Sequence, residues 1–124
     1  MLIHEALSDS ILGAAITVHR ELGPGLLESA YEECLAREFV AAGLHFTRQA
    51  KLPFLYKGQS VDRGYRLDFI VEESVIVEVK SVESLAHIHE AQILTYLKLS
   101  GLRVGLLLNF NVALMIDGIK RFVL

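Results

Sequence analysis

Two acidic residues and a lysine stand in stretches of the sequence that are otherwise apolar. Asp68 lies between Leu67 and Phe69, while Glu78 and Lys80 flank Val79. Both stretches read as strands, and residues 72–74 between them have the length of a hairpin loop. Pairing residue 71 with residue 75 places Asp68 directly opposite Glu78, with Lys80 two residues further along the same face. Strict alternation puts residues 67, 69 and 71 together on the opposite face.

Opposed carboxylates predict a metal-binding site. Two like charges facing each other destabilise a sheet, and a divalent cation between them would relieve the repulsion. Hard oxygen ligands suit Mg²⁺ or Mn²⁺. Such a metal polarises a phosphoryl oxygen and lowers the pKa of its bound water, which a nearby lysine can orient or deprotonate. The alternative is an aspartate at a strand end and a Glu–Lys pair on a solvated strand face, and the residue pattern leaves both open.

Hydrophobic periodicity and turn residues predict the elements around these positions. Helices are expected over residues 4–22, from Pro24 or Gly25 to about residue 43, and over 85–100 with Ser84 as N-cap. Strands are expected at 46–56, 60–71 (with a candidate break at Arg63-Gly64), 75–80, 104–108, 113–116 and 119–123, the last two flanking an Asp117-Gly118 turn. The order ααβββαβββ predicts an α/β fold, a mixed sheet with helices packed on it.

Composition limits the class of protein. A chain of 124 residues that is 52% hydrophobic is expected to form one domain spanning 1–124. It has no apolar run long enough to cross a membrane and no signal-peptide pattern at residues 1–5, so a cytoplasmic protein without membrane contact is expected. A single cysteine, Cys34, excludes an internal disulfide and a cysteine-rich zinc site.

Basic residues are concentrated in one segment of an otherwise acidic chain. The formal net charge is −3, yet residues 48–66 contain only one acid, Asp62, against the five bases Arg48, Lys51, Lys57, Arg63 and Arg66. One interpretation is a patch that faces phosphates, and the other is the ordinary solvent face of exposed strands.

Several motifs together resemble a known family. Asp68 followed by Glu78-Val79-Lys80 resembles the core of the PD-(D/E)xK nuclease superfamily, and Gly25-Leu26-Leu27-Glu28-Ser29-Ala30-Tyr31 matches the signature of its GxxExxY proteins. The segments 64–68, 91–97, 108–111 and 117–121 are also similar to this family, so the resemblance covers nearly the whole chain. The proline of the motif is replaced by Leu67, a position that varies in the superfamily.

The resemblance implies a restriction-endonuclease-like core and a set of site residues. Asp68 and Glu78 would bind the metal, with a further ligand from the Val79 carbonyl and a contribution from Glu28, directly or through water. Lys80 would be the catalytic lysine. Gln92 and Tyr96 resemble the Q-x-x-x-Y motif that lies beside such sites and contacts substrate or steadies the lysine.

A metal-dependent phosphodiesterase is therefore the expected function, with Mg²⁺ (or Mn²⁺ in its place) as cofactor and nucleic acid, DNA in preference to RNA, as substrate. Strand geometry adds Arg66 beside the acids, and Arg63, Lys51 and Arg48 as contacts to flanking phosphates. Two alternatives remain: a non-catalytic module that binds nucleic acid or docks a partner, and a hydrolase of smaller phosphate esters. A homodimer is expected, because a small domain covers few base pairs and two-fold pairing is common.

Overall fold

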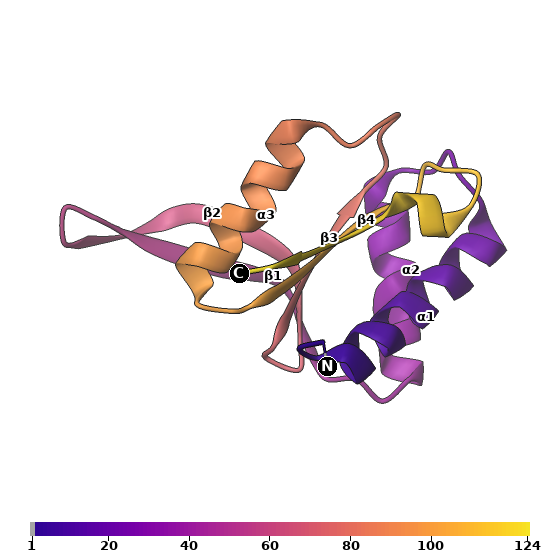
Figure 1. Cartoon of the computed structure of the whole chain (residues 1–124), viewed down its shortest axis with the longest axis horizontal. Coiled ribbons are helices and arrows are strands. Elements are labelled where there is room, and N and C mark those ends of the chain that lie inside the picture. Colours follow the sequence, from indigo (N-terminus) through magenta and orange to yellow (C-terminus); the bar gives the residue numbers. More distant parts are fainter. Residues whose placement is uncertain (1) are drawn as a thin grey trace.

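The computed structural model describes residues 2–124, so residue 1 of the expected domain lies outside the described part (Figure 1). The elements in chain order are α1 (Glu5–Leu22), α2 (Glu28–Ala41), β1 (Phe46–Tyr56), β2 (Gln59–Val71), β3 (Val75–Lys80), α3 (His87–Ser100), β4 (Val104–Asn109), the 3₁₀ helix η1 (Met115–Gly118) and β5 (Ile119–Val123). The predicted α/β class is confirmed. No helix within residues 2–124 is long and apolar enough to span a membrane.

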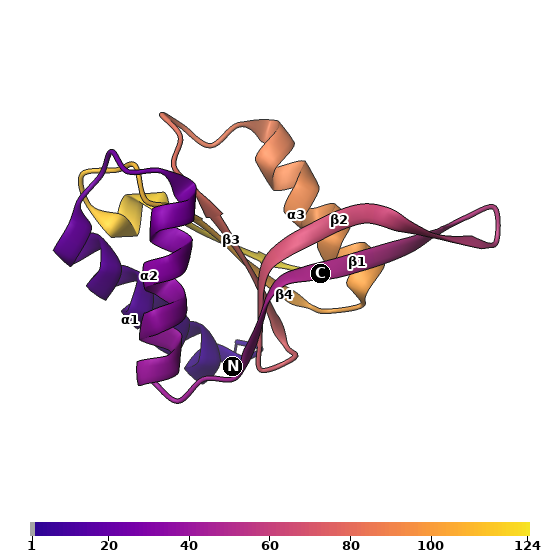
Figure 2. The same ribbon diagram turned by 180° about the vertical axis from the view of Figure 1, so that it is seen from behind.

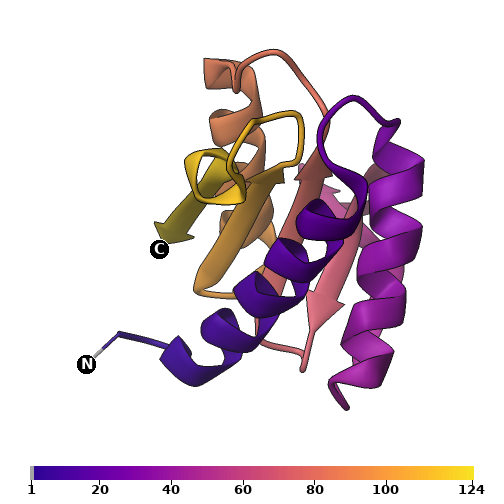
Figure 3. The ribbon, with the colours of Figure 1, turned by 90° about the vertical axis from the view of Figure 1, so that its right-hand side faces the viewer.

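One mixed sheet runs through the molecule in the order β1-β2-β3-β4-β5. β3 and β4 are parallel, and the other neighbouring strands are antiparallel. A parallel pair needs a crossover connection, which α3 provides. Helices α1 and α2 cover one face of the sheet and α3 covers the other (Figures 2 and 3).

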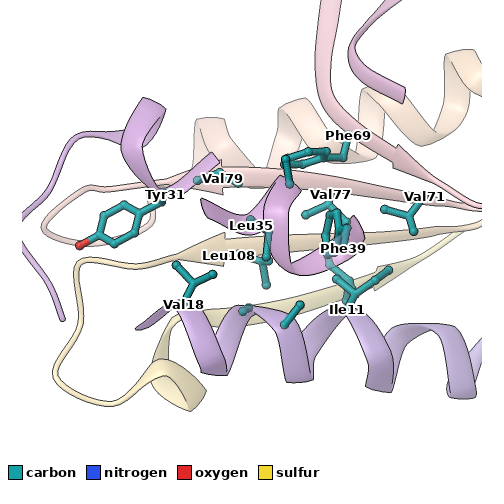
Figure 4. Packing of buried hydrophobic residues seen from close by; sticks show 14 of the residues in the cluster. Ile11, Val18, Tyr31, Leu35, Phe39, Phe69, Val71, Val77, Val79 and Leu108 are labelled. Carbon is teal, nitrogen blue, oxygen red and sulfur yellow. The ribbon is translucent and has the colours of Figure 1, made fainter. Parts of the chain in front are cut away.

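Two apolar cores join these layers. The larger core lies between the sheet and the α1–α2 pair, where Tyr31, Leu35 and Phe39 of α2 pack against Phe69 and Val77 (Figure 4). The smaller core lies between the sheet and α3, and its fully buried members include Leu67, Ile76, Ile93 and Leu107. β3 and β4 have apolar contacts on both faces, which is why their sequences are nearly continuous apolar runs.

Two helices begin later than the sequence predicts. α2 begins at Glu28 because Gly23 and Gly25 take positive φ angles of 66° and 99°, which a helix does not allow. The Tyr31 hydroxyl holds this loop, donating to the Gly23 carbonyl at 2.5 Å and accepting from the Leu26 N–H at 3.2 Å. α3 begins at His87 with Ala86, not Ser84, as its N-cap. The Ala86 N–H donates to Nδ1 of His89 at 3.0 Å.

The expected strand at 113–116 is wrong, and the sheet has five strands instead of six. Met115 is buried in the larger core, and β5 pairs with β4, with Leu108 opposite Ile119. A Cβ atom at Gly118 would lie 1.9 Å from the carbonyl oxygen of Asn109. The chain therefore crosses tightly over the end of β4, and Asp117-Gly118 belongs to a 3₁₀ turn, not to a hairpin loop.

The β1–β2 hairpin extends away from the body of the molecule (Figure 1). Its two-residue turn, Lys57 (φ 49°) and Gly58 (φ 81°), has the two positive φ angles of a type I′ turn. The pairing shifts between Leu52 and Phe54, so residues 62–64 of β2 bulge opposite Pro53. The candidate break at Arg63-Gly64 is thus a bulge in a continuous strand, at the position where proline supplies no N–H to the ladder.

Candidate active site

The predicted register between β2 and β3 is confirmed, because Val71 pairs with Val75 and Phe69 pairs with Val77. The ladder between the two strands ends at Phe69 and Val77. Beyond that pair β2 stays with β1 and moves away from β3. We call this point of separation the fork. Asp68 on β2 and Glu78 on β3 occupy the position immediately past the last ladder pair.

At the fork, each carboxylate binds a backbone N–H of the other strand. The Val79 N–H donates to Oδ2 of Asp68 at 2.7 Å, and the Asp68 N–H donates to Oε2 of Glu78 at 2.7 Å. Side-chain oxygens therefore take the place of the carbonyl groups that would continue the ladder. The two hydrogen bonds fix the positions of both carboxylates.

Burial sets the electrostatic state of the pair. Glu78 is 5% exposed and Asp68 is half-buried. Burial, followed by the neighbouring charge of Asp68, raises the pKa of Glu78 to about 8. Burial also raises the pKa of Asp68, against the lowering effect of the Val79 hydrogen bond. Two ionised carboxylates at this point are costly, and a bound cation would favour the ionised form of both.

The side chains of β2 do not alternate strictly at the fork. The expectation that residue 67 shares a face with residues 69 and 71 is therefore wrong. Leu67 packs toward α3, whereas Phe69 and Val71 pack toward α1 and α2. On β1, Gln49 takes a positive φ of 50°, and the successive side chains of Arg48 and Gln49 both reach α2. A strand that alternated strictly would separate those two side chains.

Asp68 opens into a cavity of about 320 Å³. Its walls are formed by Glu28, Ser29 and Glu32 of α2 together with Gln49, Asp68 and Val79. The Gln49 amide donates to Oε1 of Glu32 at 2.5 Å and to Oδ1 of Asp68 at 3.3 Å. The structure thus brings Glu28 to the same cavity as Asp68 and Val79. Glu78 accepts a hydrogen bond from the Asp68 N–H but does not line the cavity.

The donor set at the fork fits a hard divalent cation. Each carboxylate uses one oxygen for a backbone N–H. A cation could bind Oε1 of Glu78 and Oδ1 of Asp68, the latter in place of the 3.3 Å hydrogen bond from the Gln49 amide. Among residues 2–124 there is no cluster of three or more His, Cys, Asp or Glu side chains arranged as a metal site. A metal here would therefore complete its coordination with backbone oxygens and water, as Mg²⁺ commonly does.

A family model for the PD-(D/E)XK nuclease superfamily matches residues 5–122. The chain belongs to this superfamily. Its match extends from the start of α1 into β5 and includes the fork. The mixed sheet with helices on both faces is consistent with the restriction-endonuclease-like fold. No curated protein and no solved structure matches the chain significantly.

Lys80, the lysine of the superfamily motif, is half-buried at the end of β3. Its positive charge opposes the effect of burial and lowers the pKa of both Asp68 and Glu78. The motif's three charged residues therefore interact electrostatically, as their spacing predicts.

The two α3 residues of the Q-x-x-x-Y motif, Gln92 and Tyr96, differ in their burial and in the contacts that their side chains make. Tyr96 is buried, and its ring lies 5.2 Å from that of Tyr65 on β2. Burial, then the charge of Glu78, raises the pKa of Tyr96 to about 12. Gln92 is half-buried one turn earlier, and its amide makes no hydrogen bond within the described part of the chain.

Of the four bases expected at phosphates, Arg48 is the one that forms ion pairs within residues 2–124. Its guanidinium donates to Glu32 at 2.8 Å and to Glu33 at 2.9 Å, so acids of α2 neutralise its charge. Lys51 and Arg66 are exposed and lie directly opposite each other in the β1–β2 ladder. Arg63 is exposed in the bulge further out.

Three residues at the site were missed by sequence reasoning. Glu32 follows Glu28 at the i,i+4 spacing of one helix face, a signal that could have identified it. Ser81 connects the end of β3 to the α1–α2 loop, because its hydroxyl donates to the Leu26 carbonyl at 2.6 Å and its N–H donates to Glu28 at 3.3 Å. No sequence signal could have identified Gln49 as a site residue, because nothing in the local sequence predicts the positive φ angle of this residue.

Proposed function

We propose that this chain is a nuclease that hydrolyses phosphodiester bonds of DNA with Mg²⁺, for which Mn²⁺ can substitute. Asp68, Glu78 and the backbone carbonyl of Val79 would hold the metal. The main support is the fork, where the buried carboxylate of Glu78 and the half-buried carboxylate of Asp68, both with raised pKa values, each accept a backbone N–H of the other strand at 2.7 Å. A site that stabilises opposed acids in this way is suited to a cation.

The roles of the surrounding residues follow from their positions. A metal bound at the fork would polarise a phosphoryl oxygen and lower the pKa of a bound water. Lys80 would orient the attacking water and stabilise negative charge that develops on the phosphate. Glu28, which lines the same cavity as Asp68, would accept a hydrogen bond from the same water. On α3, Tyr96 would keep Glu78 shielded from solvent, and Gln92 would contact the substrate.

The Gly25–Glu28–Tyr31 spacing supports a place among the GxxExxY proteins. Each of these residues has a local reason for its type. Gly25 takes a φ of 99°, Glu28 accepts the Ser81 N–H, and the Tyr31 hydroxyl connects both sides of the loop. Together they place the start of α2 against the end of β3, beside Lys80.

Cleavage of labelled DNA in Mg²⁺, in Mn²⁺ and in EDTA tests the proposal. Asp68→Asn, Glu78→Gln and Lys80→Met should each lower the metal-dependent rate by about 10³-fold or more. Asp9→Asn, which removes one exposed acid of α1, should cleave like the wild type. Cleavage that persists in all three site variants would overturn the assignment.

Calorimetric titration with Mg²⁺ and Mn²⁺ separates this function from the non-catalytic alternative. Binding that is lost in Asp68→Asn supports a nuclease. No binding of either ion at millimolar concentration favours a module that only binds nucleic acid. Turnover of a small phosphodiester but not of DNA would point to the hydrolase of smaller esters.

A further inference from the structure

Residues 51–66 form a two-stranded ribbon that leaves the body of the protein just past the fork (Figures 1 and 2). Within it only Leu52 is buried, and every other side chain is exposed or half-buried. Because residues 62–64 bulge opposite Pro53, the length of the ribbon is counted along β1, where about eight residues, or about 27 Å, separate the turn from the position opposite Asp68. A ribbon this long without a core of its own is marginal unless it binds something.

The ribbon is basic, and its bases have no acidic partners. It contains the four bases Lys51, Lys57, Arg63 and Arg66 and the single acid Asp62, a net charge of +3 within a chain of net charge −3. The ion pairs formed by residues 2–124 are Arg37–Glu33, Arg48–Glu32, Arg48–Glu33 and Lys120–Glu90, and none of them includes a ribbon residue.

One pair of these bases is arranged unfavourably for the free protein. Lys51 and Arg66 are direct cross-strand partners, and like charges at opposed positions destabilise a ladder. Arg48, three residues before Lys51, is instead neutralised by two acids of α2. The uncompensated charge therefore begins at the base of the ribbon and continues toward its tip, as a surface for a polyanion would require.

The shape of the ribbon favours a duplex over a single strand. Single-strand binding relies on free aromatic faces on which bases stack. Here Lys57 covers the ring of Tyr56 at 5.5 Å, and Tyr65 packs between Phe54 and Tyr96. The B-DNA major groove is wide enough for a two-stranded ribbon, whereas the major groove of A-form RNA is too narrow for protein side chains to enter.

The base of the ribbon is fixed relative to the fork. Tyr65 on the ribbon packs against Tyr96 on α3, with the two ring centroids 5.2 Å apart. At the bulge, a Cβ atom on Gly64 would lie 2.9 Å from the Leu52 carbonyl oxygen, so the two strands approach closely there. A duplex held by the ribbon would thus have a defined position relative to Asp68.

We propose that the ribbon enters the major groove of duplex DNA and that duplex DNA is the substrate. The proposal rests on the proposed nuclease function and adds the form of the substrate and the element that holds it. One turn of B-DNA is about 34 Å long, so the ribbon and the fork can contact the same duplex at once.

The test compares two triple variants with equal loss of charge. In the ribbon variant, Lys51→Gln, Lys57→Gln and Arg63→Gln are combined. In the control variant, Arg20→Gln, Arg37→Gln and Lys98→Gln remove three exposed bases of the helices. Fluorescence anisotropy in EDTA, where no cleavage occurs, measures the Kd for duplex DNA, for one of its strands and for duplex RNA over a range of salt concentrations.

The wild type should bind duplex DNA at least about ten-fold more tightly than the other two ligands. The ribbon variant should lose about 30-fold or more for duplex DNA, and the slope of log K against log salt should fall by about 2.7. The control variant should stay within about two-fold of the wild type, because its bases lie outside the proposed contact. Tighter binding of the single strand or of RNA, or equal losses in the two variants, would overturn the proposal.

The two proposals fail in different ways. If the expected binding is found but metal-dependent cleavage is absent, the ribbon proposal stands and the nuclease proposal fails. If cleavage occurs and the ribbon variant binds duplex DNA like the wild type, only the ribbon proposal fails. Circular dichroism should show equally folded triple variants, since all six substituted side chains are exposed.

Discussion

Glu78 accepts a hydrogen bond from the backbone N–H of Asp68 at 2.7 Å, at the point where β2 and β3 separate. The same two residues are the acids of the superfamily motif. Their side chains therefore have two roles: they complete the hydrogen bonding of the fork, and they form the negative site at which we propose that a metal binds.

The stability of the metal-free protein should fall as the pH rises. The folded-state pKa of Glu78 is raised from 4.5 to about 8, so between these values the unfolded chain loses a proton that the folded chain keeps. Unfolding in urea with EDTA should show a loss on the order of a few kcal/mol from below pH 4.5 to above pH 8. Glu78→Gln should flatten this profile, and a wild-type stability that rises over the same range would contradict the raised pKa.

Metal binding should release protons. Because burial and the charge of Asp68 raise the pKa of Glu78 to about 8, the metal-free pair retains a proton on Glu78 near neutral pH that a bound cation displaces. Titration calorimetry in buffers of different ionisation enthalpy should show a release of about one proton for each Mn²⁺ bound. Glu78→Gln should release fewer, and binding without any linked proton would argue against this site.

Lys80→Met should separate catalysis from folding. The Nζ of Lys80 makes no hydrogen bond within residues 2–124, so its loss leaves the network of the fork unchanged. The cleavage rate should fall by about 10³-fold or more while the free energy of unfolding changes little. Lys98→Met on the exposed side of α3 is the matched control. A large loss of stability in Lys80→Met would show that the lysine is mainly structural.

Tyr31→Phe should loosen the loop before α2. The hydroxyl donates a hydrogen bond to the Gly23 carbonyl and accepts one from the Leu26 N–H. Its removal should lower the free energy of unfolding, measured in urea, by about 1–3 kcal/mol. Tyr56→Phe, whose side chain is exposed at the ribbon tip, should be nearly neutral. Equal effects of the two substitutions would mean that the loop does not depend on Tyr31.

Two glycine substitutions should have opposite effects. Gly118→Ala would place a Cβ atom 1.9 Å from the Asn109 carbonyl oxygen, and the backbone must move to relieve the clash, at a cost of about 3 kcal/mol. Gly13→Ala, in an exposed helical position with no atom within 4 Å, should stabilise α1 by about 0.5–1 kcal/mol. Thermal unfolding measures both, and a tolerated Gly118→Ala would contradict the tight crossing over β4.

Sequence patterns predicted the structural features that depend on periodicity. The prediction failed where segments that are distant in the chain pack against each other. Alternating apolar residues and the three-residue loop were sufficient for the register that brings Asp68 and Glu78 together. The Asp117-Gly118 pair imitates a hairpin turn, but burial of Met115 and the tight approach of Gly118 to Asn109 decide the local structure there. Local sequence cannot report such contacts.

At the candidate site, too, the local sequence did not predict contacts between distant segments. The ion pair of Arg48 and the hydrogen bond of Gln49 both depend on Glu32 of α2, which precedes them by 16 and 17 residues. Strand geometry and the cluster of bases placed Arg48 among the residues expected to contact flanking phosphates. Only the arrangement of α2 against β1 separates it from the bases of the ribbon.

The hydrogen bonds at the fork also affect how this protein can change in evolution. Replacing Asp68 or Glu78 with an apolar residue would leave a backbone N–H without its acceptor, so selection for folding alone tends to keep both acids. Lys80 has no comparable structural role. In a lineage that has lost catalysis, the lysine should therefore drift first while the acids persist, and the lysine is the better mark of an active relative.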